Sequence, residues 1–140
     1  MQGGVHNVDG FTIYPSGNDP YGNDVIGHHA RDFGANVVIS LIDVWVMKET
    51  AKKIAPALWL PWLPIDHDPV PECVLRSLEG AYLPLTYAKW GHELLTAAGV
   101  ENHYIPHGVE TNVFRVIEDI EGAKRFRREV WGDPEHVTVM

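Results

Sequence analysis

The sequence predicts an α/β fold built on a doubly wound parallel sheet, and three observations support this class. Strand-like and helix-like segments alternate along most of the chain. The segment Val37–Ile42 is almost continuously apolar, as is typical of a strand covered on both faces of a parallel sheet. Glycines at positions 34, 80 and 99 stand where helical segments should end. We therefore expect Val37–Ile42 to be a central strand.

The first elements can be placed from local composition. Phe11–Tyr14 is β-branched and aromatic, which predicts a strand, and residues 15–22 are rich in Pro, Gly, Asn and Asp, which predicts a loop. Asn23 is expected to cap a helix that ends at Gly34. The apolar side of that helix, at helical spacing, consists of Val25, Ile26, His29, Ala30 and Phe33.

The same alternation continues to the end of the chain. The remaining expected elements are a helix near Lys48–Ile54, a proline-broken strand at Leu58–Ile65, a helix near Glu72–Leu78, a strand at Tyr82–Tyr87, a helix at Lys89–Ala98, a short strand at Asn102–Pro106, a charged helix at Glu118–Trp131 and a strand beginning at His136–Met140. This order predicts a Rossmann-like parallel sheet.

Composition excludes several classes of partner. The 140 residues are 45% apolar and 21% charged, as in ordinary globular proteins. Only 11 basic residues stand against 19 acidic ones, giving a net charge of -8, so the chain lacks the basic surface that binds nucleic acid. No segment approaches the roughly 20 apolar residues of a transmembrane helix.

Cysteine use and the N-terminus indicate a cytoplasmic location. The single cysteine, Cys73, cannot form an internal disulfide or a multi-cysteine zinc site, which fits a reducing compartment. The first ten residues lack the basic and apolar regions of a secretory signal. Peripheral attachment of a longer parent protein to a membrane stays open.

Polar residues follow most of the predicted strands. In an open parallel sheet, ligands bind at the carboxyl ends of the strands, where the loops converge. We therefore expect one shared cleft among the residues at these ends, which are Ser16, Asn18 and Asp19; Asp43 and Trp45; Asp66, His67 and Asp68; Tyr87 and Lys89; and His107, Gly108 and Glu110.

Other kinds of site find little support. His28 and His29 could act as metal ligands with Asp66–Asp68, but neighbouring helix residues point about 100° apart, so no metal site is expected. The G-x-G-x-x-G spacing of dinucleotide-binding enzymes and the G-x-S-x-G of hydrolases are both missing. Trp59, Trp62 and Trp90 could stack on sugar rings or pack in a core.

A more specific motif lies at Tyr104–Phe114, Y-I-P-H-G-V-E-T-N-V-F. This segment is similar to the strand-to-linker signature of the group 1 (family 4) retaining glycosyltransferases, which have the GT-B fold. In that signature a strand ends in Pro and is followed by Asn or His, Gly, Val or Ile, and Asp, with a Phe a few residues later. The preceding Ala81–Gly99 resembles that family's last N-domain strand and helix, and Leu60–Asp68 resembles the strand that ends beside the sugar.

The resemblance implies an organisation and a function. Residues 1–114 would form part of the N-terminal, acceptor-side Rossmann-like domain, and residues 115–140 a linker helix and the first strand of a C-terminal domain that binds the nucleotide. The parent would transfer a sugar from a nucleotide-diphosphate sugar to a sugar, lipid or small-molecule acceptor with retention of configuration, without a cofactor, while the isolated chain is expected to be inactive.

The resemblance also suggests roles for single residues. Asp66 or His67 would lie beside the transferred sugar, and His107, Gly108 and Glu110 would lie at the domain junction. The acceptor side would be lined by Asp43, Trp45 and Lys89, with Asp19 as a further binding residue.

The sequence departs from the family pattern at several points. Glu110 stands where Asp is usual, Thr86-Tyr87 replaces a common serine, and the glycine-rich loop of the opening strand has no equivalent. The alternative is a non-catalytic binding or assembly module that keeps half of a GT-B scaffold. A neighbouring reading frame encoding a second α/β domain with an E-x(7)-E pair would favour the enzyme. Either form could self-associate through exposed apolar surfaces.

Overall fold

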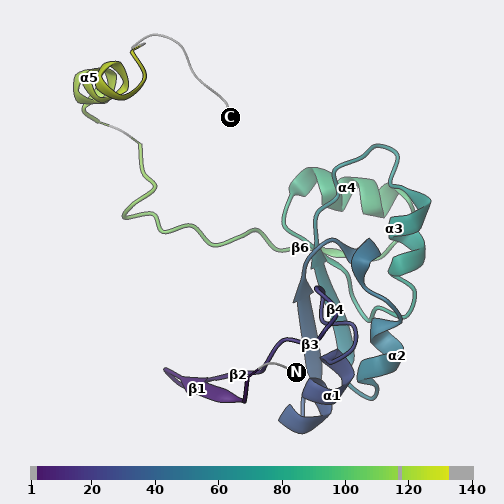
Figure 1. The fold of residues 1–140 in the computed structure, drawn as a ribbon. Helices are drawn as coiled ribbons and strands as arrows, with labels where there is room; N and C mark the ends of the chain where they lie inside the picture. The colour runs from purple at the N-terminus through teal and green to yellow at the C-terminus, as the bar shows by residue number, and fades with distance from the viewer. Residues whose placement is uncertain (1–2, 117, 133–140) are drawn as a thin grey trace. The chain divides into compact units, whose positions relative to one another are not determined.

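The computed structural model describes residues 3–116 and 118–132, and the chain separates into two compact units (Figure 1). The first unit is Met1–His107 and the second is Gly108–Met140. This boundary falls earlier than the predicted one after residue 114. The assignment of the two parts to an acceptor side and a donor side stays a prediction.

The first unit contains a parallel α/β sheet, as predicted. Its four strands lie in the order β3-β4-β5-β6, and all neighbouring pairs are parallel. The strands are β3 (Val37–Leu41), β4 (Leu58–Leu63), β5 (Leu85–Thr86) and β6 (His103–Tyr104). The helices of this unit are α1 (Ile26–Phe33), α2 (Thr50–Ile54), α3 (Glu72–Ser77) and α4 (Lys89–Ala97). A 3-10 turn, η1 (Val44–Val46), follows β3. This arrangement is consistent with a Rossmann-like fold, and each helix predicted in this unit is present. The doubly wound form, which has helices on both faces, is not shown by the described residues, whose core lies on one face of the sheet.

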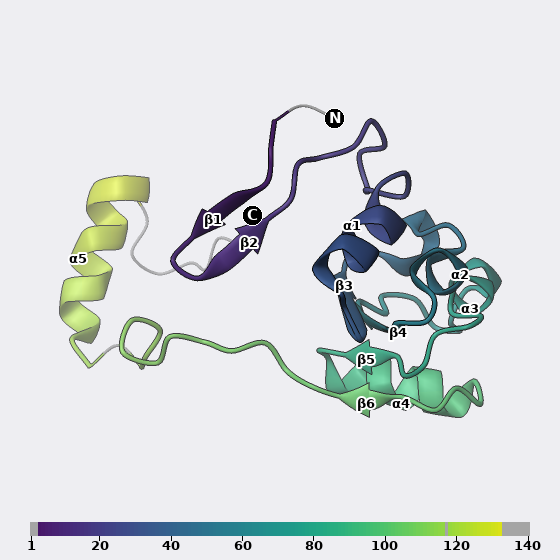
Figure 2. The same cartoon turned by 90° about the horizontal axis from the view of Figure 1, so that it is seen from below.

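The hydrophobic core lies on one face of the sheet. Along β4, Trp59, Pro61 and Leu63 are buried, whereas the intervening residues are partly or largely exposed. Residues from all four helices or their ends pack against these β4 side chains, with Leu95 of α4 completely buried. Figure 2 shows α2 and α3 on one side of the strands. Sequential parallel strands joined by right-handed crossovers carry their helices on one face in this way.

The position predicted for β3 is wrong. We expected a central strand covered on both faces, but within the described residues β3 lies at the edge of the sheet and pairs with β4 alone. Val37, Ile39 and Leu41 are 47%, 59% and 57% exposed. An apolar run indicates that both faces of a strand can be buried. It does not determine whether the strand has a neighbouring strand along each of its two edges.

The strand predicted at Phe11–Tyr14 belongs to a separate hairpin. β1 (His6–Val8) and β2 (Phe11–Ile13) form a two-stranded antiparallel sheet. They are joined by Asp9 and Gly10, both of which have positive φ angles, of 49° and 86°. Asp-Gly is favoured in such two-residue hairpin turns because both positions require the left-handed region.

Asn23 does not cap α1. The helix begins after Val25, and no side chain caps it. Instead the buried Asn23 side chain accepts a hydrogen bond from the Lys48 amide (2.7 Å) and donates one to the Val46 carbonyl (3.0 Å). It therefore joins the loop before α1 to the segment after β3. The helix ends as predicted at Gly34, which is left-handed with φ 70°.

The second unit contains one helix among its described residues, α5 (Ile120–Trp131), close to the predicted Glu118–Trp131. The Asp119 side chain accepts a hydrogen bond from the Gly122 amide (2.8 Å) at its start. The predicted strand at His136–Met140 lies outside the described residues. Across the described part of the chain, none of the helices combines the length and the apolar character that crossing a bilayer requires.

Candidate functional site

Two predicted site carboxylates lie at the same end of the sheet. Asp43 follows β3 and Asp66 follows β4, and these neighbouring strands run parallel with Leu41 opposite Trp62. Both carboxylates are exposed. Val44 and Val46 beside Asp43 are buried, so this loop is anchored by its apolar residues while its acid remains in solvent. This placement agrees with the expectation that the polar ends of the strands meet at one edge.

Three aromatic side chains from successive strand ends form a cluster at this edge. Trp62 lies near the end of β4, Tyr87 follows β5, and His107 follows β6. The ring centroids of Tyr87 and His107 are 4.4 Å apart, those of Trp62 and His107 are 4.6 Å apart, and those of Trp62 and Tyr87 are 6.4 Å apart. We call these three residues the aromatic cluster.

A hydrogen bond fixes the indole of this cluster. Trp62 Nε1 donates to the Ile105 carbonyl oxygen over 2.9 Å. Because Ile105 follows β6, this bond crosses from β4 over the short β5 and orients the ring. Trp62 and Tyr87 are half-buried and His107 is exposed, so the cluster forms part of the open surface.

The two carboxylates influence the phenol of the cluster. Partial burial raises the pKa of Tyr87 above its ordinary value, and the negative charges of Asp43 and Asp66 raise it further. Tyr87 therefore keeps its proton at physiological pH, and its hydroxyl can donate a hydrogen bond. Asp43, Asp66 and Tyr87 follow the three neighbouring strands β3, β4 and β5, which places the two acids on the same edge of the sheet as the phenol.

Asp66 and His67, the predicted catalytic residues, contact each other. His67 Nδ1 lies 2.6 Å from Asp66 Oδ1, and both side chains are exposed. In the neutral ring with its proton on Nδ1, this N–H donates a hydrogen bond to the carboxylate, and Nε2 is left as an acceptor. The pair can therefore accept a hydroxyl proton or a hydrogen bond through Nε2.

Asp19 has a structural role in its loop. Its Oδ1 accepts hydrogen bonds from the Tyr21 amide (2.8 Å), the Asn23 amide (3.2 Å) and Asn23 Nδ2 (3.0 Å). The bond from the Asn23 amide is the main cause of the lowered pKa of Asp19. No hydrogen bond or ring contact joins this carboxylate to the aromatic cluster in the described part of the chain.

Two further predicted residues are exposed near the strand ends. Trp45 is 57% exposed and projects from η1 between two buried valines. Lys89 opens α4, two residues after Tyr87, and its Nζ lies 3.9 Å from Glu93 Oε1. Its ammonium group is therefore the cation nearest in sequence to the cluster.

Gly108 and Glu110 belong to the second unit, so only His107 of the predicted junction residues shares a unit with the sheet. The Glu110 carbonyl accepts bonds from the Val113 amide (3.0 Å) and the Phe114 amide (2.8 Å), which close a turn. Phe114, the phenylalanine of the motif, is 71% exposed. The junction roles of Gly108 and Glu110 stay predictions.

No group of three or more His, Cys, Asp or Glu side chains within residues 3–116 and 118–132 is arranged to hold a metal ion. His28 and His29 have ring centroids 5.9 Å apart, and His29 Nε2 donates to the Pro15 carbonyl over 3.0 Å. That bond occupies one ring nitrogen, and Tyr14 stacks on the ring at 4.6 Å.

Sequence reasoning placed Tyr87 among the strand-end residues of the expected cleft without giving it a role, and it left Trp62 open between stacking on a sugar and packing in a core. Tyr87 ends its predicted strand, which is the signal that selected it, whereas Trp62 lies within the predicted strand Leu58–Ile65, and tryptophan is as suited to a core as to a surface. The distances that make them a cluster with His107 depend on the order of the strands.

The chain matches no protein-family model, and no curated protein or solved structure matches it. The function of the chain is therefore inferred from the geometry of the strand ends and from the motif at Tyr104–Phe114.

Proposed function

We propose that this chain is part of the acceptor-side half of a retaining nucleotide-sugar glycosyltransferase, and that the aromatic cluster with Asp43, Asp66 and His67 binds a neutral sugar. The observation that carries the proposal is the set of three rings beside two carboxylates at the carboxyl ends of parallel strands. Open α/β sheets bind ligands at this edge.

The chemistry of the cluster suits a sugar ring. A pyranose has an apolar C–H face, which packs on aromatic rings, and a rim of hydroxyl groups. Ionised carboxylates only accept hydrogen bonds, so Asp43 and Asp66 can bind hydroxyl hydrogens, while the neutral Tyr87 hydroxyl can donate to a sugar oxygen. Hydrogen bonds in which one partner is charged are the stronger ones.

The same charges make this edge unfavourable for a diphosphate. Asp43 and Asp66 repel phosphate, and Lys89 lies near a carboxylate of its own helix. In the proposed reaction the bond from the anomeric carbon to the diphosphate oxygen breaks, and a bond to the acceptor oxygen forms on the same face. The acceptor hydroxyl proton passes to the departing phosphate. Stabilising that phosphate requires oriented cations or amides, which we assign to the donor-side half.

A matched pair of tyrosine variants tests sugar binding. Tyr87→Phe removes only the hydroxyl of the cluster, whereas Tyr82→Phe makes the same change at a residue that is 65% exposed. Calorimetric titration with methyl glycosides should show binding to the chain that Tyr87→Phe weakens about 2- to 12-fold, the value of one hydrogen bond of about 0.5–1.5 kcal/mol. Tyr82→Phe should bind as the unaltered chain does.

A second assay tests the division of labour. The purified chain, incubated with UDP-, GDP- and ADP-sugars and a panel of acceptors, should neither hydrolyse nor transfer the sugar, because the groups that stabilise the departing phosphate lie elsewhere. Robust transfer would show that the donor site is present in this chain and would overturn the proposed division. Absence of binding by any neutral sugar would remove the basis of the proposal itself.

A further inference from the structure

The outer edge of β3 has an unpaired row of backbone groups. In the described residues β3 pairs only with β4, so no strand pairs with the amide and carbonyl groups of its other edge. The strand is Val-Val-Ile-Ser-Leu, with no charged residue and no proline. Soluble proteins usually protect edge strands with charges, prolines or bulges, and an unprotected apolar edge is a template for another strand. This edge has none of those protections.

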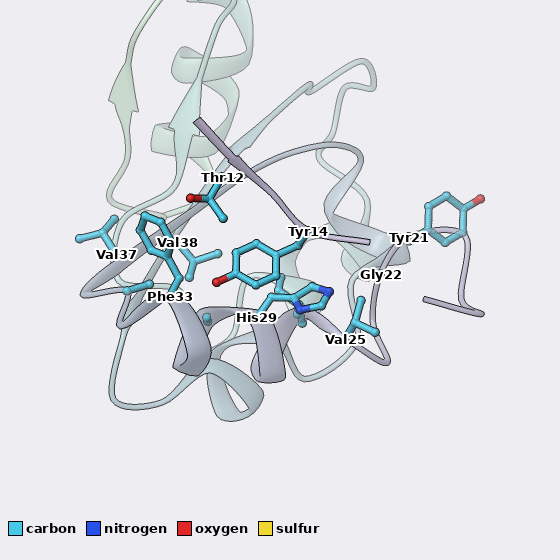
Figure 3. Close-up of a pocket in the computed structure, with 12 residues that line it drawn as sticks. Thr12, Tyr14, Tyr21, Gly22, Val25, His29, Phe33, Val37 and Val38 are labelled. Carbon is cyan, nitrogen blue, oxygen red and sulfur yellow. The ribbon is translucent and has the colours of Figure 1, made fainter. Parts of the chain in front are cut away.

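The side chains beside this edge are apolar as well. Val37, Ile39 and Leu41 are exposed on the face opposite the core, while Val38 and Ser40 are half-buried on the helix side. On the helix side, a hollow of about 460 Å³ opens next to the start of β3 (Figure 3). Its walls include Thr12, Tyr14, His29, Phe33, Val37 and Val38.

We propose that β3 pairs with β3 of a second copy of this chain, antiparallel across a two-fold axis at Ile39. In this register Ile39 faces the partner's Ile39, Val37 faces the partner's Leu41, and Val38 faces the partner's Ser40. A two-fold interface requires a surface that is complementary to itself. The strand meets this requirement because opposite residues are apolar or small and uncharged.

Charge does not oppose this register although the whole chain carries -8. The acid nearest to the strand is Asp43, two residues beyond its end. In the proposed pairing Asp43 faces the partner's Ala35, so the two Asp43 carboxylates do not meet. Like charges directly opposite in a sheet would be destabilising.

The hollow lies beside the partner strand in the same arrangement. Residues 38, 40 and 42 alternate onto the helix side, and the partner's Ile42 lies opposite Asn36. That position is next to the hollow, which Ala35 and Val37 line. Ile42 packs against the core of its own copy, so by symmetry each partner strand borders the hollow of the other copy without filling it. The pairing thus covers apolar surface and joins two four-stranded sheets into one.

Cysteine cross-linking tests the axis. In antiparallel strands, directly opposite residues have Cα atoms about 4.5–5.5 Å apart, within the range of a disulfide. Ile39→Cys, in a Cys73→Ser background that removes the exposed native thiol, should form disulfide-linked dimers under mild oxidation. Val37→Cys in the same background is the matched control, because the two altered residues would be about 13 Å apart, four steps of the strand, and should not cross-link.

Two further measurements make the outcome decisive. Sedimentation of the unaltered chain should show a dimer whose fraction rises with concentration, and Ile39→Lys should remove it, while Ile39→Val should keep it. Hydrogen exchange should show concentration-dependent protection of β3 amides. A strict monomer, or equal cross-linking of Ile39→Cys and Val37→Cys, would overturn the proposal. Preferential cross-linking of Leu58→Cys, an exposed residue on the same face but on β4, would instead indicate stacking of the open faces and would also overturn it.

Discussion

The buried Asn23 offers the sharpest test of how the fold positions the site edge. Its side chain donates to the Val46 carbonyl and to Asp19, and it accepts from the Lys48 amide. Asn23→Ala removes all three bonds and leaves the Val46 carbonyl without this partner in a residue that is 6% exposed. We expect the loop before α1 and the segment after β3 to lose their connection.

The magnitude follows from the groups left unpaired. A buried polar group without a partner costs about 1–3 kcal/mol. The Val46 carbonyl should carry most of that cost, while the Lys48 amide belongs to an exposed residue and can reach water. The free energy of unfolding should therefore fall by about 1–3 kcal/mol, which corresponds to about 5–15 °C in Tm for a unit of this size.

Denaturant titration monitored by circular dichroism measures this loss. Asn18→Ala is the control, because the Asn18 backbone amide, which donates to Asp24, is kept in the variant. That exposed substitution should change the free energy of unfolding by no more than about 0.5 kcal/mol. If both variants lose the same stability, the three side-chain bonds of Asn23 do not have the role assigned to them.

Three further predictions concern stability. Gly27→Ala should destabilise the first unit strongly, because an added Cβ would lie 2.5 Å from the Lys53 carbonyl oxygen. Gly108→Ala is the control, since open space surrounds Gly108, and it should have little effect in the same thermal melt. Leu95→Ala, at a side chain that is 0% exposed, should cost about 2–5 kcal/mol in urea unfolding, and a cost below 1 kcal/mol would contradict its place in the core. The lowered pKa of Asp19 contributes stability that is present above its unfolded pKa, near 4, and lost as the pH falls through the folded value. Asp19→Asn should therefore reduce the loss of stability at acid pH, measured by unfolding at a series of pH values. An unchanged pH dependence would refute this role of Asp19.

Much of the fold could be predicted from sequence because local patterns determine it. The helical spacing before Gly34, the apolar run at Val37–Ile42 and the helix from Lys89 all correspond to observed elements. The edge position of β3 could not be predicted, because position in a sheet depends on distant strands. The prediction that Asn23 caps a helix was wrong because its side chain bonds to main-chain partners 23 and 25 residues away.

The edge at which the strand ends meet could be predicted better than the side chains that come together there. Polar residues after parallel strands pointed to one edge, and Asp43, Asp66 and His107 all lie around Tyr87. Asp19 was selected by the same rule, but its carboxylate is used within its own loop. The contribution of Trp62 depends on a hydrogen bond to Ile105, 43 residues later in the chain, which no local pattern contains.

The most direct test of the proposed function is a ¹H–¹⁵N NMR titration of the labelled chain. The indole resonance of Trp62 and the amide resonances of Tyr87 and His107 should shift and saturate with a neutral methyl glycoside. UDP without a sugar should leave these resonances in place, because the edge carries two carboxylates. Saturable shifts with UDP alone, or none with any sugar, would contradict the assignment of this edge as a neutral-sugar site.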